Sequence, residues 1–169
     1  ERKHDINEAV KETEFLLNKS VALQLQSDAS IGIQLSGGID STLLTEIANQ
    51  HTKIKHLYCS TFKNYQKNEL KYAKIVSKKI NINLNKVELN KNFFFNNIDK
   101  SIYHLDEPLN HPHSLAFLQI SQKAKKKVSV MLAGEGADEL FFGYERYLKI
   151  LKSKINTSMI KNGAFLRTK

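Results

Sequence analysis

IQLSGGIDSTLL, residues 33–44, joins an apolar segment to a helix-like segment through two adjacent glycines. The run from Ile31 to Leu35 is short, apolar and bounded by turn-forming residues, which predicts a strand. Apolar residues recur at helical spacing from position 40 to 50, which predicts a helix. Gly37 and Gly38 stand at the junction, where glycine permits positive φ angles and lets a ligand approach the backbone closely.

Such a turn suits an anion. Successive amides can form an anion-binding nest, and the start of the next helix adds free N–H groups and partial positive charge. Ser36 and Ser41 supply hydroxyl donors, whereas Asp40 suits a phosphate site only if a cation such as Mg²⁺ lies between them. The alternative is an ordinary turn with Asp40 or Ser41 near an N-cap. The spacing matches neither the dinucleotide fingerprint nor the Walker loop.

Strands and helices alternate along the chain, which predicts an α/β fold with a doubly wound, mostly parallel sheet and helices on both faces. Ligands of such folds bind beyond the carboxyl ends of the strands, where both glycine-rich loops fall. The expected strands are 31–35, 54–62, 83–89 and 128–133. The expected helices are 7–25, 40–50, 69–80, 94–102, 114–125 and 139–151.

The second glycine-rich loop lies within VMLAGEGADELFFGYERY, residues 130–147. Glu135, Asp138 and Glu139 place three carboxylates at a binding edge, which is costly unless a cation neutralises some of them. Asp138 and Asp40 are therefore expected to converge on one shared Mg²⁺. The alternative is that Asp138 and Glu139 occupy the first turn of a helix, where acids are favoured.

These motifs resemble a known family. SGGIDS after a strand is similar to the pyrophosphate loop of the N-type ATP pyrophosphatases, and GEGADELFFGY resembles the signature of glutamine-hydrolysing asparagine synthetases. HLDEPLNHP and SDASIGIQLSGGIDSTLL resemble two further elements of that family, in the same order. The resemblance covers residues 7–150 and implies the adenine nucleotide alpha hydrolase-like fold.

The resemblance also implies roles for particular residues. The pyrophosphate of ATP would be held by Ser36, Gly37, Gly38, Asp40 and Ser41, and the adenosine would be flanked by Leu35, Ser60, Ala133 and Gly134. Mg²⁺ would be bound by Asp40 and Asp138. Glu135 would be the catalytic residue that assists attack by ammonia, with Tyr144 packed nearby. Two residues depart from the family pattern: Ala133 replaces a serine, and Phe142 replaces a glycine.

The implied reaction is ATP-dependent amide formation through an acyl-adenylate, with ATP and Mg²⁺ as cofactors. In its plain form, aspartate, ATP and ammonia from glutamine give asparagine, AMP and pyrophosphate. The partners would be a small-molecule carboxylate, ammonia and an N-terminal glutaminase domain. Residues 1–169 are expected to form a single synthetase-type domain, truncated at the C-terminus and inactive by itself. The sequence leaves open another carboxylate, such as a sugar acid of a surface polysaccharide, and leaves open a homodimer.

Composition narrows the remaining function classes. The net charge of +9 permits a basic tRNA-binding or tRNA-modifying relative, but the lysines are mostly spread out, so solvated surface is favoured over nucleic-acid binding. No apolar stretch has the length of a membrane span. The lone Cys59 indicates a reducing, cytoplasmic setting and a buried position. His111 and His113 alone are a weak metal site, and the run Phe93 to Phe95 is expected to face the core.

Overall fold

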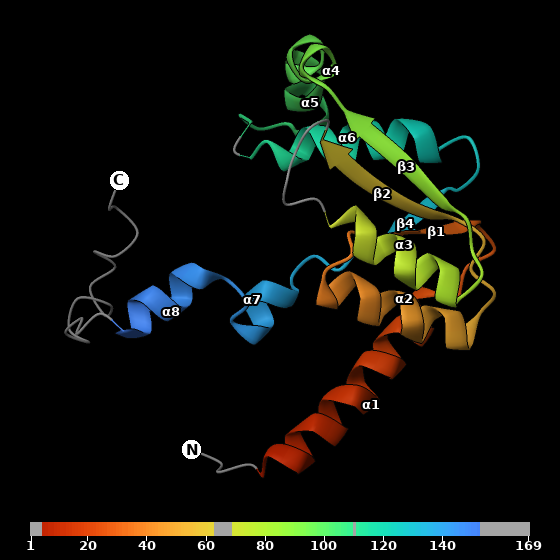
Figure 1. The fold of residues 1–169 in the computed structure, drawn as a ribbon, viewed down its shortest axis with the longest axis vertical. Coiled ribbons are helices and arrows are strands. Elements are labelled where there is room, and N and C mark those ends of the chain that lie inside the picture. Colours follow the sequence, from red (N-terminus) through yellow and green to blue (C-terminus); the bar gives the residue numbers. More distant parts are fainter. Residues whose placement is uncertain (1–4, 63–68, 110, 153–169) are drawn as a thin grey trace. The chain divides into compact units, whose positions relative to one another are not determined.

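The computed structural model describes residues 5–62, 69–109 and 111–152. The chain forms two compact units, divided between Gly134 and Glu135. The first unit contains the sheet and most of the helices, and the second contains the two last helices (Figure 1). Within the described residues, no helix is both long and apolar enough to span a membrane.

The sheet of the first unit has four parallel strands in the order β3-β2-β1-β4. They are β1 (Ile31–Gln34), β2 (Leu57–Phe62), β3 (Leu84–Leu89) and β4 (Val130–Leu132). Ile33 of β1 is in register with Leu57 on one side and with Leu132 on the other. The chain moves outward from β1 to β3 and then returns to the opposite side of β1. The carboxyl ends of β1 and β4 therefore form a topological switch point, where ligands bind in open α/β sheets.

Helices cover both faces of the sheet, as the alternating pattern predicts (Figure 1). One face packs against α1 (Ile6–Gln24), α2 (Ile39–His51) and α3 (Leu70–Lys79). The other packs against α6 (His113–Ala124), which contacts β2 and β3. Successive residues of β2 alternate between the faces, because strand side chains have a period of two. Leu57 and Cys59 enter the first core, and Tyr58 enters the second.

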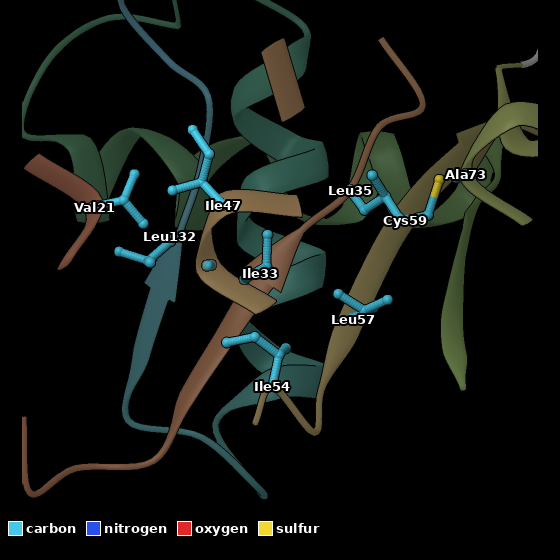
Figure 2. Close-up of a cluster of buried hydrophobic side chains, with 10 residues drawn as sticks. Val21, Ile33, Leu35, Ile47, Ile54, Leu57, Cys59, Ala73 and Leu132 are labelled. Atoms are coloured by element: carbon cyan, nitrogen blue, oxygen red, sulfur yellow. The ribbon is translucent and has the colours of Figure 1, made fainter. Parts of the chain in front are cut away.

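The core on the α1–α3 side is continuous across three strands, since it draws buried residues from β1, β2 and β4 (Figure 2). Ile33 and Leu57 are fully buried there, and Ile47 and Ala73 supply the helix side. Cys59 is a buried member of this cluster, which confirms the prediction from its apolar neighbours. This packing fixes the starts of α2 and α3 close to the carboxyl edge of the sheet.

The helix expected over residues 94–102 is instead two helices, α4 (Lys91–Asn96) and α5 (Ile98–Leu105). The prediction of one helix is wrong because Asn97 adopts φ −123 and ψ 9, which interrupts the helical backbone. Phe93 and Phe94 pack onto the cluster around Leu115. Phe95 is 68% exposed, so the expectation that all three phenylalanines face the core fails at this residue.

The second unit likewise contains two helices where the sequence predicts one. These are α7 (Ala137–Phe141) and α8 (Glu145–Lys152). Phe142 ends α7 in the left-handed region with φ 58 and ψ 37, so the helix cannot continue through it. This is the position where the family signature carries glycine, the residue that adopts such a backbone most readily.

Candidate functional site

The loop between β1 and α2 forms the centre of the candidate site. Leu35, which follows β1, is fully buried, and its N–H donates to the carbonyl of Tyr58 at 2.8 Å. Gly37 adopts φ +100, and a Cβ at this position would lie 2.5 Å from the backbone oxygen of Glu69. Glycine is therefore required here twice over, for its backbone angle and for the close approach of α3.

Two serine hydroxyls brace this loop. The buried Ser41 Oγ accepts a hydrogen bond from the Ser36 N–H at 3.2 Å, and lies 2.9 Å from Ser36 Oγ and 3.2 Å from the Gly38 carbonyl. Ser36 Oγ in turn accepts from the Gly38 N–H at 3.2 Å. Both serines predicted to bind pyrophosphate are thus side by side, and the loop is shaped by its own hydrogen bonds.

The start of α2 presents further donors at the same place. The first hydrogen bond of the helix runs from the Thr42 N–H to the Gly38 carbonyl at 3.1 Å. The N–H groups of Ile39, Asp40 and Ser41 precede it and have no intrahelical acceptor. They also stand at the positive end of the helix dipole. The Asp40 side chain is exposed beside them, in the first turn.

The loop after β4 closes against this turn. A Cβ on Gly134 would lie 3.2 Å from Ser41 N and 3.3 Å from Asp40 Cβ, which is tighter than ordinary packing. Gly134, the first glycine of the second motif, meets the first motif because β1 and β4 are paired and parallel. Ala133 lies directly before Gly134 at the same edge and is half-buried.

Ser60 belongs to the same edge through β2. Its neighbour Cys59 has its sulfur 3.8 Å from the Ser36 carbonyl and 3.5 Å from the Ser60 carbonyl. Burial, followed by the charge of Glu69, raises the pKa of the Cys59 thiol to about 11. The first unit contains the predicted residues Leu35, Ser36, Gly37, Gly38, Asp40, Ser41, Ser60, Ala133 and Gly134. Direct contacts join Ser36, Gly38 and Ser41 to one another and Gly134 to Asp40 and Ser41.

This arrangement fits a phosphate and a hard cation. Free amides, serine hydroxyls and a helix N-terminus are the donors that anions require. Because Gly134 has no Cβ, its backbone can lie close to Asp40 and Ser41. The exposed Asp40 carboxylate is an oxygen ligand of the kind that Mg²⁺ prefers. Among the described residues there is no group of three or more His, Cys, Asp or Glu side chains that could hold a metal. Phosphate oxygens would have to complete a site built on Asp40.

Glu135, Asp138 and Glu139 belong to the second unit. Glu135 is exposed, and Asp138 and Glu139 occupy the first turn of α7, as the helical interpretation expects. Asp138 is held by its neighbours, because the Gly143 N–H donates to its carbonyl at 3.0 Å and a Cβ on Gly143 would strike its carboxylate. The magnesium site shared by Asp40 and Asp138 stays a prediction, as does the catalytic role of Glu135.

Tyr144 is tied to the same segment. Its hydroxyl donates to the Glu139 carboxylate at 2.7 Å, and this hydrogen bond is the main reason that its pKa is raised to about 12. The Arg146 guanidinium lies 4.2 Å from the centre of the Tyr144 ring. Elsewhere, the rings of His111 and His113 are 5.0 Å apart, and no third metal ligand joins them among the described residues.

Sequence reasoning missed Glu69. Its backbone oxygen touches Gly37, and its side-chain oxygen Oε2 lies 3.8 Å from the position of a Cβ on Gly38. Position 69 is expected from the sequence only as the start of a helix. The available signal is an acid directly before the helix that follows β2, because that end of the helix faces the carboxyl edge of the sheet.

The comparison with protein families decides the classification. The family model for asparagine synthase matches residues 12–168. The chain belongs to the asparagine synthase family. Within this family, it is similar to asparagine synthetase [glutamine-hydrolyzing] 1 of Bacillus subtilis, with 34% identity over 146 residues. That match covers 86% of this chain but 23% of the relative, so the chain spans about a quarter of the length of that protein.

Solved structures place this asparagine synthase family member in the predicted fold. NMN synthetase from Francisella tularensis superposes with a TM-score of 0.55 at 20% identity, covering 79% of this chain and 58% of that one. A glutamine-dependent NAD⁺ synthetase from Acinetobacter baumannii, solved with ADP, gives 0.54 at 16% identity, covering 76% and 26%. These likenesses, with the parallel sheet, confirm the adenine nucleotide alpha hydrolase-like fold.

Proposed function

We propose that the loop formed by residues 36–41 binds the phosphates of MgATP, and that the full-length protein uses it for ATP-dependent amide formation. The observation that carries this proposal is the contact of Gly134 with Asp40 and Ser41. This contact brings Gly134, at the start of the second motif, against a loop that carries amide, hydroxyl and carboxylate groups. Membership of the asparagine synthase family supports the same conclusion.

In the proposed reaction, an oxygen of the acceptor carboxylate attacks the α-phosphorus of ATP. The bond between the α- and β-phosphates breaks, and pyrophosphate leaves. The amides of α2 and the hydroxyls of Ser36 and Ser41 stabilise the charge on the departing pyrophosphate. Ammonia then attacks the acyl carbon, AMP leaves, and Glu135 takes up the proton that ammonia loses. Mg²⁺, held by Asp40 and Asp138, would neutralise part of the phosphate charge.

The proposed acceptor is aspartate, and the proposed ammonia source is glutamine. Both follow from the family, whose relative in Bacillus subtilis is named a glutamine-hydrolysing asparagine synthetase. Hydrolysis of glutamine would take place in an N-terminal glutaminase domain. ATP and Mg²⁺ are the proposed cofactors, and the A. baumannii structure of the same fold contains ADP.

The test is release of pyrophosphate by the full-length protein with aspartate, glutamine, ATP and Mg²⁺. Asp40→Ala is expected to reduce this release at least a hundredfold, on the order of the loss of a major electrostatic contact to the reacting phosphates. Asp99→Ala, which removes an exposed acid from the first turn of α5, is the matched control and should leave the release unchanged.

If the Asp40→Ala variant releases pyrophosphate at the wild-type rate, the metal-binding role of Asp40 is contradicted. If the wild-type protein releases pyrophosphate only with another carboxylate, the amidation chemistry stands and the acceptor is different. A panel containing aspartate, glutamate and a sugar acid distinguishes these outcomes. No nucleotide binding and no release with any acceptor would overturn the proposed function itself.

A further inference from the structure

Glu69 lies against the phosphate loop in a way that the proposed reaction does not use. It directly precedes α3, and its carbonyl accepts hydrogen bonds from Tyr72 N–H at 2.8 Å and Ala73 N–H at 3.2 Å. A Cβ on Gly37 would lie 2.5 Å from that carbonyl and 2.9 Å from Ala73 N. The backbone of Glu69 is therefore packed directly on the loop, which fixes where its side chain begins.

The side chain of Glu69 continues toward the loop. Its Oε2 lies 3.8 Å from the position of a Cβ on Gly38, the residue that caps α2. The carboxylate is exposed, and it forms no hydrogen bond or ion pair with the described residues that would neutralise it. Its charge also acts beneath the loop, since it contributes to the raised pKa of Cys59.

A negative charge at this point opposes the amides of α2. A bare polyphosphate bound by the loop would lie close to the Glu69 carboxylate, and like charges at short range repel one another even in a water-like medium. A polyphosphate that carries Mg²⁺ presents positive charge to the same carboxylate. The sign of the interaction therefore depends on the cation.

We propose that Glu69 is a specificity-determining residue that makes phosphate binding by this loop dependent on magnesium. It disfavours the metal-free anion and favours the magnesium complex. This inference rests on the proposed function, because it takes the loop to be a phosphate site. It assigns to the chain a second carboxylate, beside Asp40, that faces the bound anion.

The test is calorimetric titration of the full-length protein with inorganic pyrophosphate, in excess Mg²⁺ and in EDTA. Glu69→Gln is expected to bind metal-free pyrophosphate roughly three- to tenfold more tightly than wild type, the size expected from removing one charge at this range. Binding in Mg²⁺ should be unchanged or weaker. Glu69→Lys should strengthen metal-free binding further, because it places a positive charge where Glu69→Gln only removes the negative one.

Glu46→Gln is the matched control, because it removes the same charge from α2 at an exposed ion pair with Lys79. It should change both affinities less than twofold. The inference is overturned if Glu69→Gln has the wild-type ratio of affinities with and without Mg²⁺, or if Glu46→Gln shifts that ratio equally. Wild-type protein that binds pyrophosphate in neither condition would overturn the proposed phosphate site, and the inference with it.

Discussion

Two constraints require glycine at position 37: a positive φ angle and the absence of a Cβ. Gly136 is subject only to the first of them. Gly37 and Gly136 have similar backbone angles, with φ +100 and φ +91. A Cβ on Gly37 would meet the Glu69 carbonyl at 2.5 Å, whereas a Cβ on Gly136 would meet nothing within 4 Å. The pair therefore separates the cost of backbone strain from the cost of a steric clash.

We expect Gly37→Ala to lower the free energy of unfolding by roughly 2–4 kcal/mol, since α3 has to move away from the loop. Gly136→Ala should cost about 1 kcal/mol, which is the strain alone. Urea unfolding measured by circular dichroism gives both values. Equal losses in the two variants would show that the close approach of Glu69 to the loop contributes nothing.

Tyr144 provides a test in the second unit. Its hydroxyl donates to the Glu139 carboxylate, which favours the protonated phenol and raises its pKa from 10.0 to about 12. Ionisation would also place two negative charges side by side. Glu139→Ala should therefore lower the pKa of Tyr144 toward 10, measured by the tyrosinate absorbance during an alkaline titration. Glu145→Ala, which removes an exposed acid of α8, should leave that titration unchanged.

At the scale of single elements, the break between α7 and α8 depends on Phe142. Its left-handed backbone costs a residue with a Cβ about 1–2 kcal/mol. In return, its ring meets that of Tyr147 edge-on, with 5.3 Å between the centres, and such pairs contribute about 0.5–1.5 kcal/mol. The two effects nearly cancel, which accounts for a phenylalanine where the family signature has glycine.

Two substitutions of Phe142 separate these effects. Phe142→Ala loses the ring contact and keeps the strain, whereas Phe142→Gly loses both. Amide hydrogen exchange at Gly143 reports the turn, because this N–H donates to the Asp138 carbonyl at 3.0 Å. Exchange in the glycine variant should be about fivefold slower than in the alanine variant, which corresponds to about 1 kcal/mol. Faster exchange in the glycine variant would rule out backbone strain at this position.

Neither helix break could be predicted from the spacing of apolar residues. Apolar residues at 94, 98 and 102 keep helical spacing across Asn97, and those after Glu139 keep it across Phe142, so the pattern predicts single helices. A periodic pattern reports which face is apolar, and it does not report whether the backbone between apolar positions is continuous.

At the scale of the whole molecule, β1 holds the first unit together, because it is paired on both edges and packs into the core on the α1–α3 side. Ile33 is fully buried at its centre, in register with Leu57 and Leu132. Ile33→Ala should lower the free energy of unfolding by about 2–5 kcal/mol, the usual cost of such a cavity.

Val130→Ala is the control for this prediction. Val130 lies in β4, also opposite β1, but it is 37% exposed, so its truncation should cost less than about 1 kcal/mol. Both values come from denaturant unfolding of the same protein. A loss at Ile33 no larger than that at Val130 would contradict the central position of β1 in the core.

The sequence alone determined the alternation of strands with helical segments, the parallel doubly wound class, and the two glycine-rich loops at the carboxyl ends of β1 and β4. These features are local, since each follows from side-chain period, turn residues and short motifs within a few positions. The buried position of Cys59 and the positive φ of Gly37 at the strand-to-helix junction followed in the same way, whereas Gly38 has φ −71.

Only the tertiary structure decided which distant groups meet at the site. The contact of Gly134 with Asp40 and Ser41 depends on the pairing of β4 with β1, and the approach of Glu69 to Gly37 and Gly38 depends on how α3 packs across the sheet. Neither is encoded in a local pattern, because strand order and helix packing are chosen by the burial of a shared core. That core fixes the distances between loops far apart in the chain.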